Sequence, residues 1–406
     1  MRSIEEIPNN PFLPGYPIYP SNFVGRNQDV ETMLRYLPRV IQQGIPEHFF
    51  ITGKRGMGKT SFVQYVANMA EKEYGMIPIY INNEGSNTIN DLIANLLEVL
   101  FKEFDKTTWG QKIIDDFCSR FGGVNFGGFG ISFNEKTEIV RNVNENFREF
   151  LIEICDELDD NEKGIFIIID DVNGLSETPD FANWYKGLFE TLGFYGDYIP
   201  IVFCLVTYPA KFDQLCKQNP SFSRMFNLIS IDKLEDNDIK EFFSKNFQNL
   251  NIKFEKEQYL NDMVDYSWGM PLVMQQIGDS IFWNLESDLI DEKVVYEGIK
   301  NAAINIKNKQ LKYTLEKIKS PHYRNILLKL AKNSLIKFNK SQLKELLNET
   351  EKTVLDDFID KILILNVIES VGDNNGEYEF SNLLFFTYFL ITSTFNDIFF
   401  TQGINA

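Results

Sequence analysis

The sequence predicts an α/β protein with a parallel sheet, followed by an all-helical region and a C-terminal unit of helices and a hairpin. Up to about residue 231, apolar runs of strand length alternate with amphipathic segments of helical length. After residue 232 the strand patterns stop and helical periodicity continues. Near the C-terminus, helical segments precede two short strand patterns around Gly-Asp-Asn-Asn-Gly. Three helices and a hairpin are typical of a winged helix-turn-helix.

Composition limits the classes of function. The chain has 406 residues, which favours two or three domains, and its net charge is −18. A uniform charge of this sign repels nucleic acid and anionic lipid, so either partner needs a local basic patch. Four scattered cysteines and two histidines favour a reducing compartment and argue against a Cys/His zinc site. The N-terminus lacks a signal core, and the apolar run Leu383–Phe395 is too short for a membrane span. We therefore expect a cytoplasmic protein with no membrane partner.

The chain opens with a proline-rich arm. Its prolines fall at positions 8, 11, 14, 17 and 20, the period of a polyproline II helix. Two interpretations stay open: an extended arm packed on its own domain, and a ligand for a proline-binding domain.

The elements then follow in order. Strands are expected at 48–53, 76–83, 164–171, 198–209 and 226–231, and the first helices at 28–43, 59–73 and 88–104. The glycine-rich stretch 121–133 interrupts this alternation and predicts a hairpin-like surface insertion, before a charged helix near 136–158. Later helices are expected at 236–248, 256–267, 271–286, 290–304, 321–333, 340–347 and 351–364, with a buried helix at 383–395.

These elements divide into four predicted regions. They are a Pro-rich arm (1–22), an α/β domain (23–233) with a Gly-rich insertion at about 104–145, a helical lid (234–306) and a winged-helix domain (307–406).

The loop after the first strand has the pattern of a phosphate site. In TGKRGMGKTS, Gly53, Gly58, Lys59 and Thr60 match GxxxxGK[ST] between a strand and a helix. The glycines let backbone N–H groups point at phosphate, and the next helix presents its N-terminus to the same anion. Lys59 neutralises the β- and γ-phosphates, and Thr60 ligates Mg²⁺. The predicted loop comprises Gly53, Lys54, Arg55, Gly56, Met57, Gly58, Lys59, Thr60 and Ser61, and its predicted cofactors are ATP or ADP and Mg²⁺.

Two adjacent acids end the strand GIFIIIDD. Ligands of parallel α/β sheets bind at the carboxyl ends of the strands. We expect Asp170 to hold Mg²⁺ through water and Asp171 to orient or activate the attacking water. The alternative for Asp171 is that it caps the next turn. Asn82 and Asn83, which follow the second strand, either hydrogen-bond the catalytic acid or simply end the strand.

With these motifs, the chain resembles the AAA+/STAND group of P-loop ATPases, above all archaeal-type ATPases and relatives of origin-recognition and helicase-loader proteins. The resemblance implies that the FVGR residues contact adenine through the backbone and that Thr207 is a polar sensor near the γ-phosphate. It implies that Pro271, in WGMP, closes the lid over the nucleotide. Arg224 corresponds to an arginine finger that reaches the neighbouring copy of a homo-oligomer; the alternative is a surface arginine. The FVGR residues are Phe23, Val24, Gly25 and Arg26.

Two departures from the AAA+ pattern matter. The strand ends in Asp-Asp where AAA+ enzymes generally have Asp-Glu, and the G-x-P region carries no arginine. Both imply slow turnover and a nucleotide-controlled switch rather than a fast motor. No separate effector domain is visible in the sequence, so an output protein partner is expected to be encoded elsewhere.

The charges of the C-terminal region conflict. From Lys307 to Lys344 there are eleven basic residues and one acid, Glu316, a patch suited to DNA phosphates. The presumptive recognition helix, ETEKTVLDDFIDKIL, is acidic, which opposes entry into a major groove. DNA binding, protein docking and autoinhibitory packing therefore all stay open.

The leading function is an ATP-hydrolysing switch that couples its Mg-ATP state to partner or nucleic-acid engagement. One alternative is a DNA-binding initiator or loader. The other is a non-catalytic, ADP-bound scaffold that recruits a partner protein.

Overall fold

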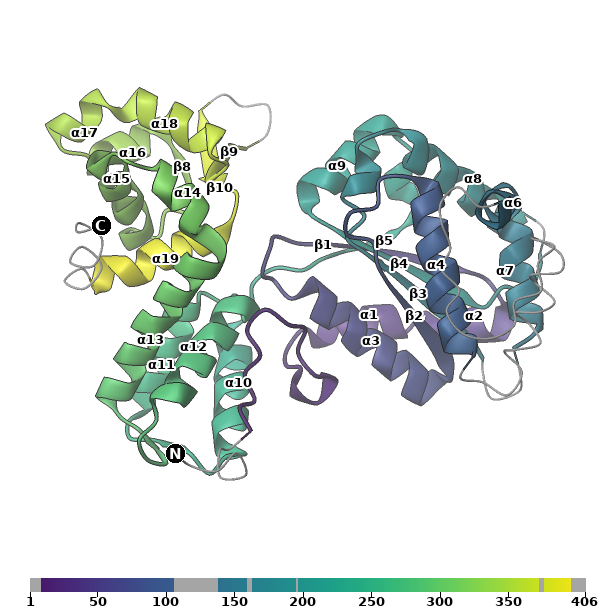
Figure 1. The fold of residues 1–406 in the computed structure, drawn as a ribbon, viewed down its shortest axis with the longest axis horizontal. Helices are drawn as coiled ribbons and strands as arrows, with labels where there is room; N and C mark the ends of the chain where they lie inside the picture. The colour runs from purple at the N-terminus through teal and green to yellow at the C-terminus, as the bar shows by residue number, and fades with distance from the viewer. Residues whose placement is uncertain (1–8, 106–137, 159–162, 195, 372–375, 396–406) are drawn as a thin grey trace. The chain divides into compact units, whose positions relative to one another are not determined.

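The computed structural model describes residues 9–105, 138–158, 163–194, 196–371 and 376–395 (Figure 1). These residues form two compact units. The sheet unit comprises Arg26–Gly53 and Lys59–Ile231, and the helical unit comprises the described residues up to Gly25, Lys54–Gly58 and those from Asp232 onward. The glycine-rich stretch 121–133 lies outside the described residues, and the four-domain division stays a prediction.

The centre of the sheet unit is a parallel sheet, as predicted. Among the described residues its order is β2-β3-β4-β1-β5, and every neighbouring pair is parallel. The strands are β1 (Glu47–Thr52), β2 (Met76–Asn82), β3 (Gly164–Asp170), β4 (Ile201–Thr207) and β5 (Asn227–Ser230). Strands β1, β3 and β4 are buried along their whole length, which explains their continuous apolar sequences.

Helices cover both faces of this sheet (Figure 1). One face carries α1 (Asn27–Leu34), α2 (Leu37–Gln43) and α3 (Lys59–Tyr74). The other carries α4 (Ile89–Phe104), α6 (Glu138–Glu145), α7 (Phe147–Asp156), α8 (Asp180–Phe194) and α9 (Pro209–Gln218), with the short turns η3 (Gly174–Ser176) and η4 (Phe222–Met225). The helix expected at 28–43 is two helices, because Pro38 lies in the first turn of α2 and is not tolerated inside a continuous helix.

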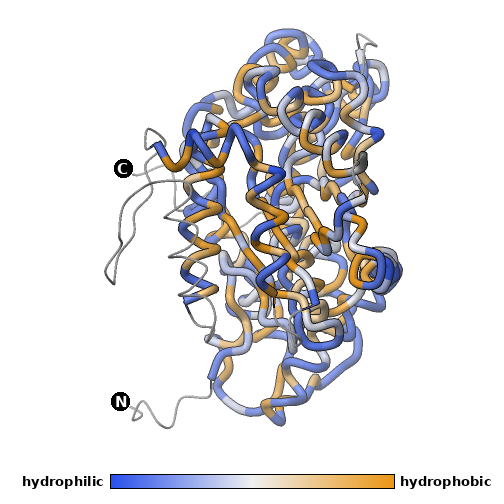
Figure 2. The backbone as a smooth tube through the Cα atoms, turned by 90° about the vertical axis from the view of Figure 1, so that its right-hand side faces the viewer, coloured by the Kyte–Doolittle hydropathy of each residue, from blue (hydrophilic) through white to orange (hydrophobic). Residues whose placement is uncertain are grey.

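The helical unit contains the predicted lid helices. They are α10 (Asp236–Gln248), α11 (Glu257–Ser267), α12 (Pro271–Asn284) and α13 (Glu292–Ile306), with the parallel pair β6 (Lys253–Phe254) and β7 (Leu289–Ile290). Blue and orange alternate along the helices of Figure 2, as expected of helices with one buried side.

The arm packs on these helices, as the first interpretation of its prolines expects. Phe12 is buried beside Phe242 and Phe247, and the Leu13 N–H donates to Gln275 Oε1 at 2.8 Å. The described arm ends in the short turn η2 (Pro20–Asn22).

The C-terminal part of the helical unit begins with a π-helical turn, η5 (Lys307–Leu311). Helices α14 (Lys312–Lys317), α15 (Pro321–Lys332), α16 (Lys340–Leu346), α17 (Glu349–Thr353), α18 (Leu355–Ile364) and the buried α19 (Leu383–Thr394) follow. Strands β8 (Lys337–Asn339), β9 (Ile368–Ser370) and β10 (Glu377–Phe380) form an antiparallel sheet of order β8-β10-β9. These elements are compatible with the predicted winged helix.

Two details of this part differ from the expectation. The helix expected at 351–364 is divided between α17 and α18 at Val354. Glu351, one of the acids of the presumptive recognition helix, is buried and accepts a hydrogen bond from Lys329 Nζ at 2.5 Å. A buried carboxylate needs such a partner, so this acid stabilises the subdomain rather than facing solvent. None of the described helices is long and apolar enough to cross a bilayer.

Candidate functional site

The carboxyl ends of four strands meet along one edge of the sheet. The register pairs Thr52 with Thr207, Val206 with Asp170, and Asp170 with Asn82. Strand β4 lies between β1 and β3, so Thr207 lies between the phosphate-loop strand and the two acids. In this way the fold gathers residues that are 125 positions apart in the chain, from 82 to 207, on one edge.

Thr60 and Asp170 are in direct contact. The Thr60 hydroxyl donates to Asp170 Oδ2 at 2.6 Å, and the Tyr80 hydroxyl donates to the same oxygen at 2.7 Å. Burial and the neighbouring Asp170 carboxylate raise the pKa of Tyr80, so the phenol remains a donor. A hydroxyl and a carboxylate oxygen are the hard ligands that Mg²⁺ prefers, so these two residues fit the predicted metal site.

Lys59 is held at the base of the loop. Its Nζ donates to the Gly53 carbonyl at 2.8 Å and lies 4.4 Å from the centroid of the Tyr208 ring. A carbonyl and an aromatic face both stabilise an ammonium group. Lys59 is therefore held close to the first glycine of the loop, beside the position expected for phosphate.

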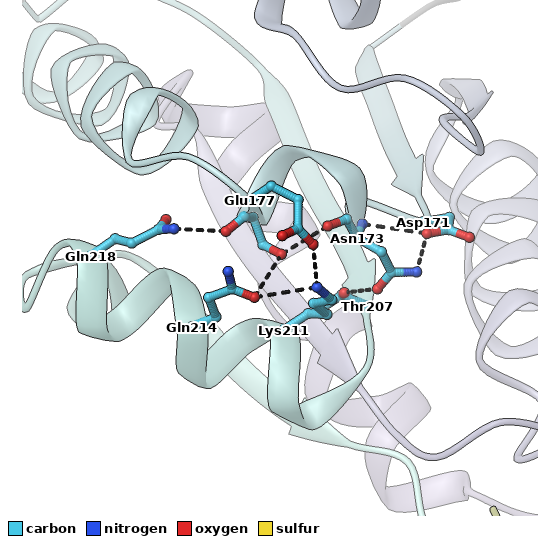
Figure 3. A network of polar contacts seen from close by, with 8 residues as sticks. Asp171, Asn173, Glu177, Thr207, Lys211, Gln214 and Gln218 are labelled. Carbon is cyan, nitrogen blue, oxygen red and sulfur yellow. Dashed lines mark hydrogen bonds and ion pairs between the residues drawn. The ribbon is translucent and has the colours of Figure 1, made fainter. Parts of the chain in front are cut away.

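Asp171 follows β3 in a left-handed conformation, with φ of 64°. Its Oδ1 accepts hydrogen bonds from the backbone N–H and the side-chain amide of Asn173, so Asp171 does cap the next turn. The Asn173 Oδ1 in turn accepts a hydrogen bond from the Thr207 hydroxyl (Figure 3). These hydrogen bonds form a continuous chain from Thr207, the predicted sensor, through Asn173 to Asp171, the second acid. We call this chain the relay.

The turn that carries this relay is anchored to α9. Ser176 Oγ donates to the Asn173 carbonyl at 2.8 Å, and Gln218 Nε2 donates to the Ser176 carbonyl at 2.7 Å (Figure 3). Lys211, also on α9, forms an ion pair with Glu177. These contacts restrain the position of Asn173, and through it the orientation of the Asp171 carboxylate.

Asn83 is fully buried at the same edge, at 0% exposure. Its backbone N–H donates to the Asp170 carbonyl at 2.8 Å, whereas neither side-chain polar atom has a hydrogen-bond partner among the described residues. An orphaned buried amide is unusual in a native protein. Asn82 is exposed and its Oδ1 accepts from the Glu84 N–H, which is the strand-ending role.

The middle of the phosphate loop belongs to the helical unit. Gly56 and Gly58 both have φ of 82°, a left-handed conformation that favours glycine. The Leu272 N–H donates to the Gly56 carbonyl at 3.3 Å, and a Cβ on Gly58 would lie 3.4 Å from Pro271. The predicted G-x-P segment therefore contacts this part of the loop.

The remaining loop side chains differ in their surroundings. Lys54 Nζ donates to Glu379 Oε1 at 2.8 Å and to the Phe380 carbonyl at 3.0 Å. Arg55 donates to Gln310 Oε1 at 3.3 Å, and Met57 is buried. Ser61 is partly exposed in the first turn of α3.

The boundary between the two units falls within the FVGR residues, between Gly25 and Arg26. Phe23 follows η2, Val24 is buried, and Gly25 has φ of 70°. A side chain at Gly25 would clash with Asp238, which lies 2.4 Å from the position of a Cβ. Arg26 begins the sheet unit as the residue before α1, with φ of 59°.

Arg224 is separate from the relay. It is exposed on η4, just before β5, and its guanidinium forms no ion pair with any residue that the structure describes. An exposed, unpaired arginine is compatible with both interpretations of this residue.

Three residues at the site were not predicted. Tyr80 lies on the apolar strand β2, and its hydroxyl contacts Asp170. Asn173 is a turn residue two positions after Asp171, and Tyr208 directly follows Thr207, the predicted sensor. Only Asn173 carried a sequence signal, since asparagine after a strand marks a turn.

Comparisons with known proteins agree with this geometry. The family described as "ATPase domain predominantly from Archaea" matches residues 26–277, more than half of the chain. Among curated proteins, comparison of the sequence finds no match.

Two solved proteins have a similar structure. The Walker-type ATPase PABY2304 of Pyrococcus abyssi is 14% identical, with 91% of this chain and 96% of that chain covered and a TM-score of 0.51. The Aeropyrum pernix ORC2 protein in ADPNP-ADP complexes is 12% identical, with 91% and 95% covered and a TM-score of 0.52. Its ADP form gives the same identity and TM-score, with 92% and 96% covered. At such identities the likeness shows the fold alone.

Proposed function

Because the chain belongs to the family of ATPase domains found predominantly in Archaea, we propose that this P-loop ATPase is a slow, Mg²⁺-dependent switch. The observation that carries the proposal is the relay from Thr207 through Asn173 to Asp171, beside the Thr60–Asp170 contact. Together these residues provide a candidate metal site (Thr60 and Asp170), a candidate water-positioning acid (Asp171) and a candidate sensor hydroxyl (Thr207). The Aeropyrum pernix ORC2 structures, which contain ADP and ADPNP, support nucleotide as the ligand.

Each residue then has a role in binding or positioning. Lys59 exchanges the Gly53 carbonyl for the β- and γ-phosphates of ATP. Thr60 and Asp170 would hold the Mg²⁺, which would neutralise charge on the phosphates. Asp171 orients the attacking water, and Asn173 keeps its carboxylate in place.

Slow turnover has a physical reason at Asp171. The left-handed backbone at this position suits aspartate, whose short side chain bonds locally, and is unfavourable for glutamate. Oδ1 already accepts two hydrogen bonds from Asn173. Both features limit how far this carboxylate extends toward a water.

The switch itself relies on the middle of the phosphate loop. Lys54–Gly58 belong to the helical unit, with Gly56 bonded to Leu272 and Lys54 paired with Glu379. Binding of phosphate to the loop N–H groups thereby affects residues that contact α12 and β10. We infer that nucleotide state changes the helical unit, and that its C-terminal part engages an output protein partner.

The test is Mg²⁺-dependent ATP hydrolysis by the wild type, Lys59→Ala and Asp171→Asn. We expect Lys59→Ala to lose both nucleotide binding and hydrolysis, because it removes the phosphate cation. We expect Asp171→Asn to bind nucleotide normally and to hydrolyse it roughly 10²-fold more slowly or worse. Asp213→Asn, an exposed aspartate on α9, is the control and should match the wild type.

Two results would oppose the proposal. Equal rates in all the variants would remove the assigned roles of Lys59 and Asp171. ADP that copurifies with the protein and does not exchange with ATP would favour the non-catalytic scaffold, and mass spectrometry of the released nucleotide detects it.

A further inference from the structure

The basic residues of the C-terminal region differ in their partners. Lys329, Lys337 and Lys340 form ion pairs with Glu351, Glu379 and Asp356. In contrast, no described residue forms an ion pair with any lysine of the segment 307–319, namely Lys307, Lys309, Lys312, Lys317 and Lys319. Lys332 and Lys344 are also exposed without a described ion pair, but each is a single residue. Positive charge available to a partner is therefore densest in residues 307–319.

The backbone of this segment places its lysines in solvent. Ile306 and Leu311 are both buried and are five residues apart, the spacing of the π-helical turn η5. Leu315 and Ile318 continue the buried side through α14. The lysines between these anchors necessarily face outward: Lys309, Lys312, Lys317 and Lys319 are exposed, and Lys307 is partly exposed.

An aromatic ring stands among these lysines. Tyr313 is 73% exposed, and Lys317 Nζ lies 3.8 Å from the centroid of its ring. The cation occupies one face of the ring, so the opposite face is the one open to stacking. An exposed aromatic flanked by cations is the arrangement with which proteins stack an unpaired base and hold its phosphates.

A pocket of about 260 Å³ adjoins the same segment. Leu315, Leu328 and Phe389 supply its apolar lining, and Lys307, Lys312 and Arg324 supply positive charge, against one acid, Glu316. Lys312 lines the pocket and is the residue before Tyr313, which is itself not among the lining residues. An apolar recess with a cationic border suits a flat base attached to a phosphate.

The helix that would read a duplex has the opposite charge. Asp356, Asp357 and Asp360 are exposed on α18, and Lys340 is paired with Asp356. Carboxylates in a major groove face the phosphates of both strands unfavourably. Lys317 and Lys319 line a pocket together with Asp357 and Asp360 of α18, whereas Lys307, Lys309 and Lys312 do not line it. A single strand can instead follow Lys307, Lys309 and Lys312.

We propose that residues 307–319, with the adjoining pocket, form a binding surface for single-stranded nucleic acid. The lysines contact phosphates, Tyr313 stacks on one base, and the pocket accepts a neighbouring base. This surface shares no residue with the phosphate site of the ATPase, so the inference stands or falls independently of the proposed function.

The test measures fluorescence anisotropy of labelled dT20, rU20 and a 20-base-pair duplex with the full-length protein at about 50 and 200 mM salt. We expect the wild type to bind one or both single strands more tightly than the duplex. The double variant Lys309→Gln/Lys312→Gln should weaken binding roughly tenfold at low salt. The slope of log K against log[salt] should become less negative by about 0.7 for each phosphate contact that is lost. The two single strands distinguish DNA from RNA as the ligand.

Tyrosine variants test the stacking contact. Tyr313→Ala should lower affinity by roughly fivefold to a hundredfold, whereas Tyr313→Phe, which keeps the ring, should bind like the wild type. Lys293→Gln, an exposed lysine in the first turn of α13, is the matched control and should leave binding unchanged. All of these side chains are exposed, so folding and ATPase activity should be normal in every variant.

Three outcomes would overturn the proposal. They are no binding of either single strand at low salt, tighter binding of the duplex, and wild-type affinity in both the double lysine variant and Tyr313→Ala.

Discussion

At the scale of single residues, polar side chains are buried in this protein for two different purposes. Asp170 and Asn173 are tied into the row at the sheet edge, where their oxygens are arranged for a ligand. His48 is buried in the core instead, with its Nδ1 2.8 Å from the Tyr185 hydroxyl and its ring stacked on Phe203. The first group forms the proposed ligand site, and His48 serves packing, which is the commoner role of an isolated histidine in an apolar strand.

His48 makes stability depend on pH. Burial lowers its pKa to about 3 in the folded protein, below the value of 6.5 for an exposed histidine. Between these pH values the unfolded chain binds a proton that the folded chain excludes, so acidification destabilises the fold by about 1.4 kcal/mol per pH unit. This contribution is fully present above pH 6.5 and is lost as the pH falls toward 3. Urea unfolding at pH 7.0, 6.0 and 5.0 should show a shallower pH dependence for His48→Phe, and identical slopes would contradict this.

At the scale of elements, local pattern and tertiary packing contribute differently. Helices α3 and α10 begin and end within one residue of their expected limits, because their apolar spacing and flanking residues are local. The Pro-rich arm is different: its period predicts an extended segment but not what covers it. The structure shows that Phe12 attaches the arm, since its side chain is 2% exposed and lies against α10 and against Gly278 of α12. The absence of a side chain at Gly278 makes room for that ring.

The arm should therefore contribute to stability through Phe12. Phe12→Ala should lower the free energy of unfolding by about 3–5 kcal/mol, because it leaves a large cavity among the aromatic rings of α10. Tyr16→Ala, in the same arm but 76% exposed, should change it by less than about 0.5 kcal/mol. Thermal and urea unfolding measure both, and similar losses in the two variants would mean that the arm does not pack as described.

At the scale of the whole molecule, the net charge of −18 conceals a strong local asymmetry. The acids concentrate on surfaces such as α18, while the unpaired lysines concentrate in residues 307–319. Arg224 is an exposed cation on η4 of the sheet unit. Arg224 could contact the nucleotide of its own copy or that of a neighbouring copy in an oligomer. An experiment that mixes two variants distinguishes these cases.

If Arg224 is an arginine finger that acts on the neighbouring copy, two inactive variants should restore each other's activity when mixed. Arg224→Ala should lower ATP hydrolysis on the order of 10³-fold, because transition-state charge loses its partner. Mixing Arg224→Ala with Lys59→Ala should restore activity, because a mixed homo-oligomer pairs one intact phosphate loop with one intact arginine. Lys217→Ala, an exposed cation on α9, is the control. A wild-type rate in Arg224→Ala, or no recovery on mixing, would identify Arg224 as an ordinary surface residue.

Much of the candidate site could be predicted because it lies in short motifs. The loop from Gly53 to Ser61 and the acids at 170 and 171 are each recognisable within ten residues. Tyr80, Asn173 and Tyr208 could not be assigned to it, since each acts through a contact that depends on strand order or on a turn. The burial of Glu351 was missed for a related reason: it is an acid of an acidic helix by pattern, and its partner Lys329 lies on another helix.

The sequence by itself determined the alternation of strands and helices, the parallel sheet, the phosphate loop and the two acids. Each of these depends on local periodicity or on residues adjacent in the chain. Tertiary structure alone decided that β4 lies between β1 and β3, that Asn173 connects Thr207 with Asp171, and which lysines of the C-terminal region are paired. Hydrogen bonds and ion pairs act over about 3–4 Å in space, whatever the separation in sequence, so the composition of a segment cannot reveal which of its charges are already neutralised.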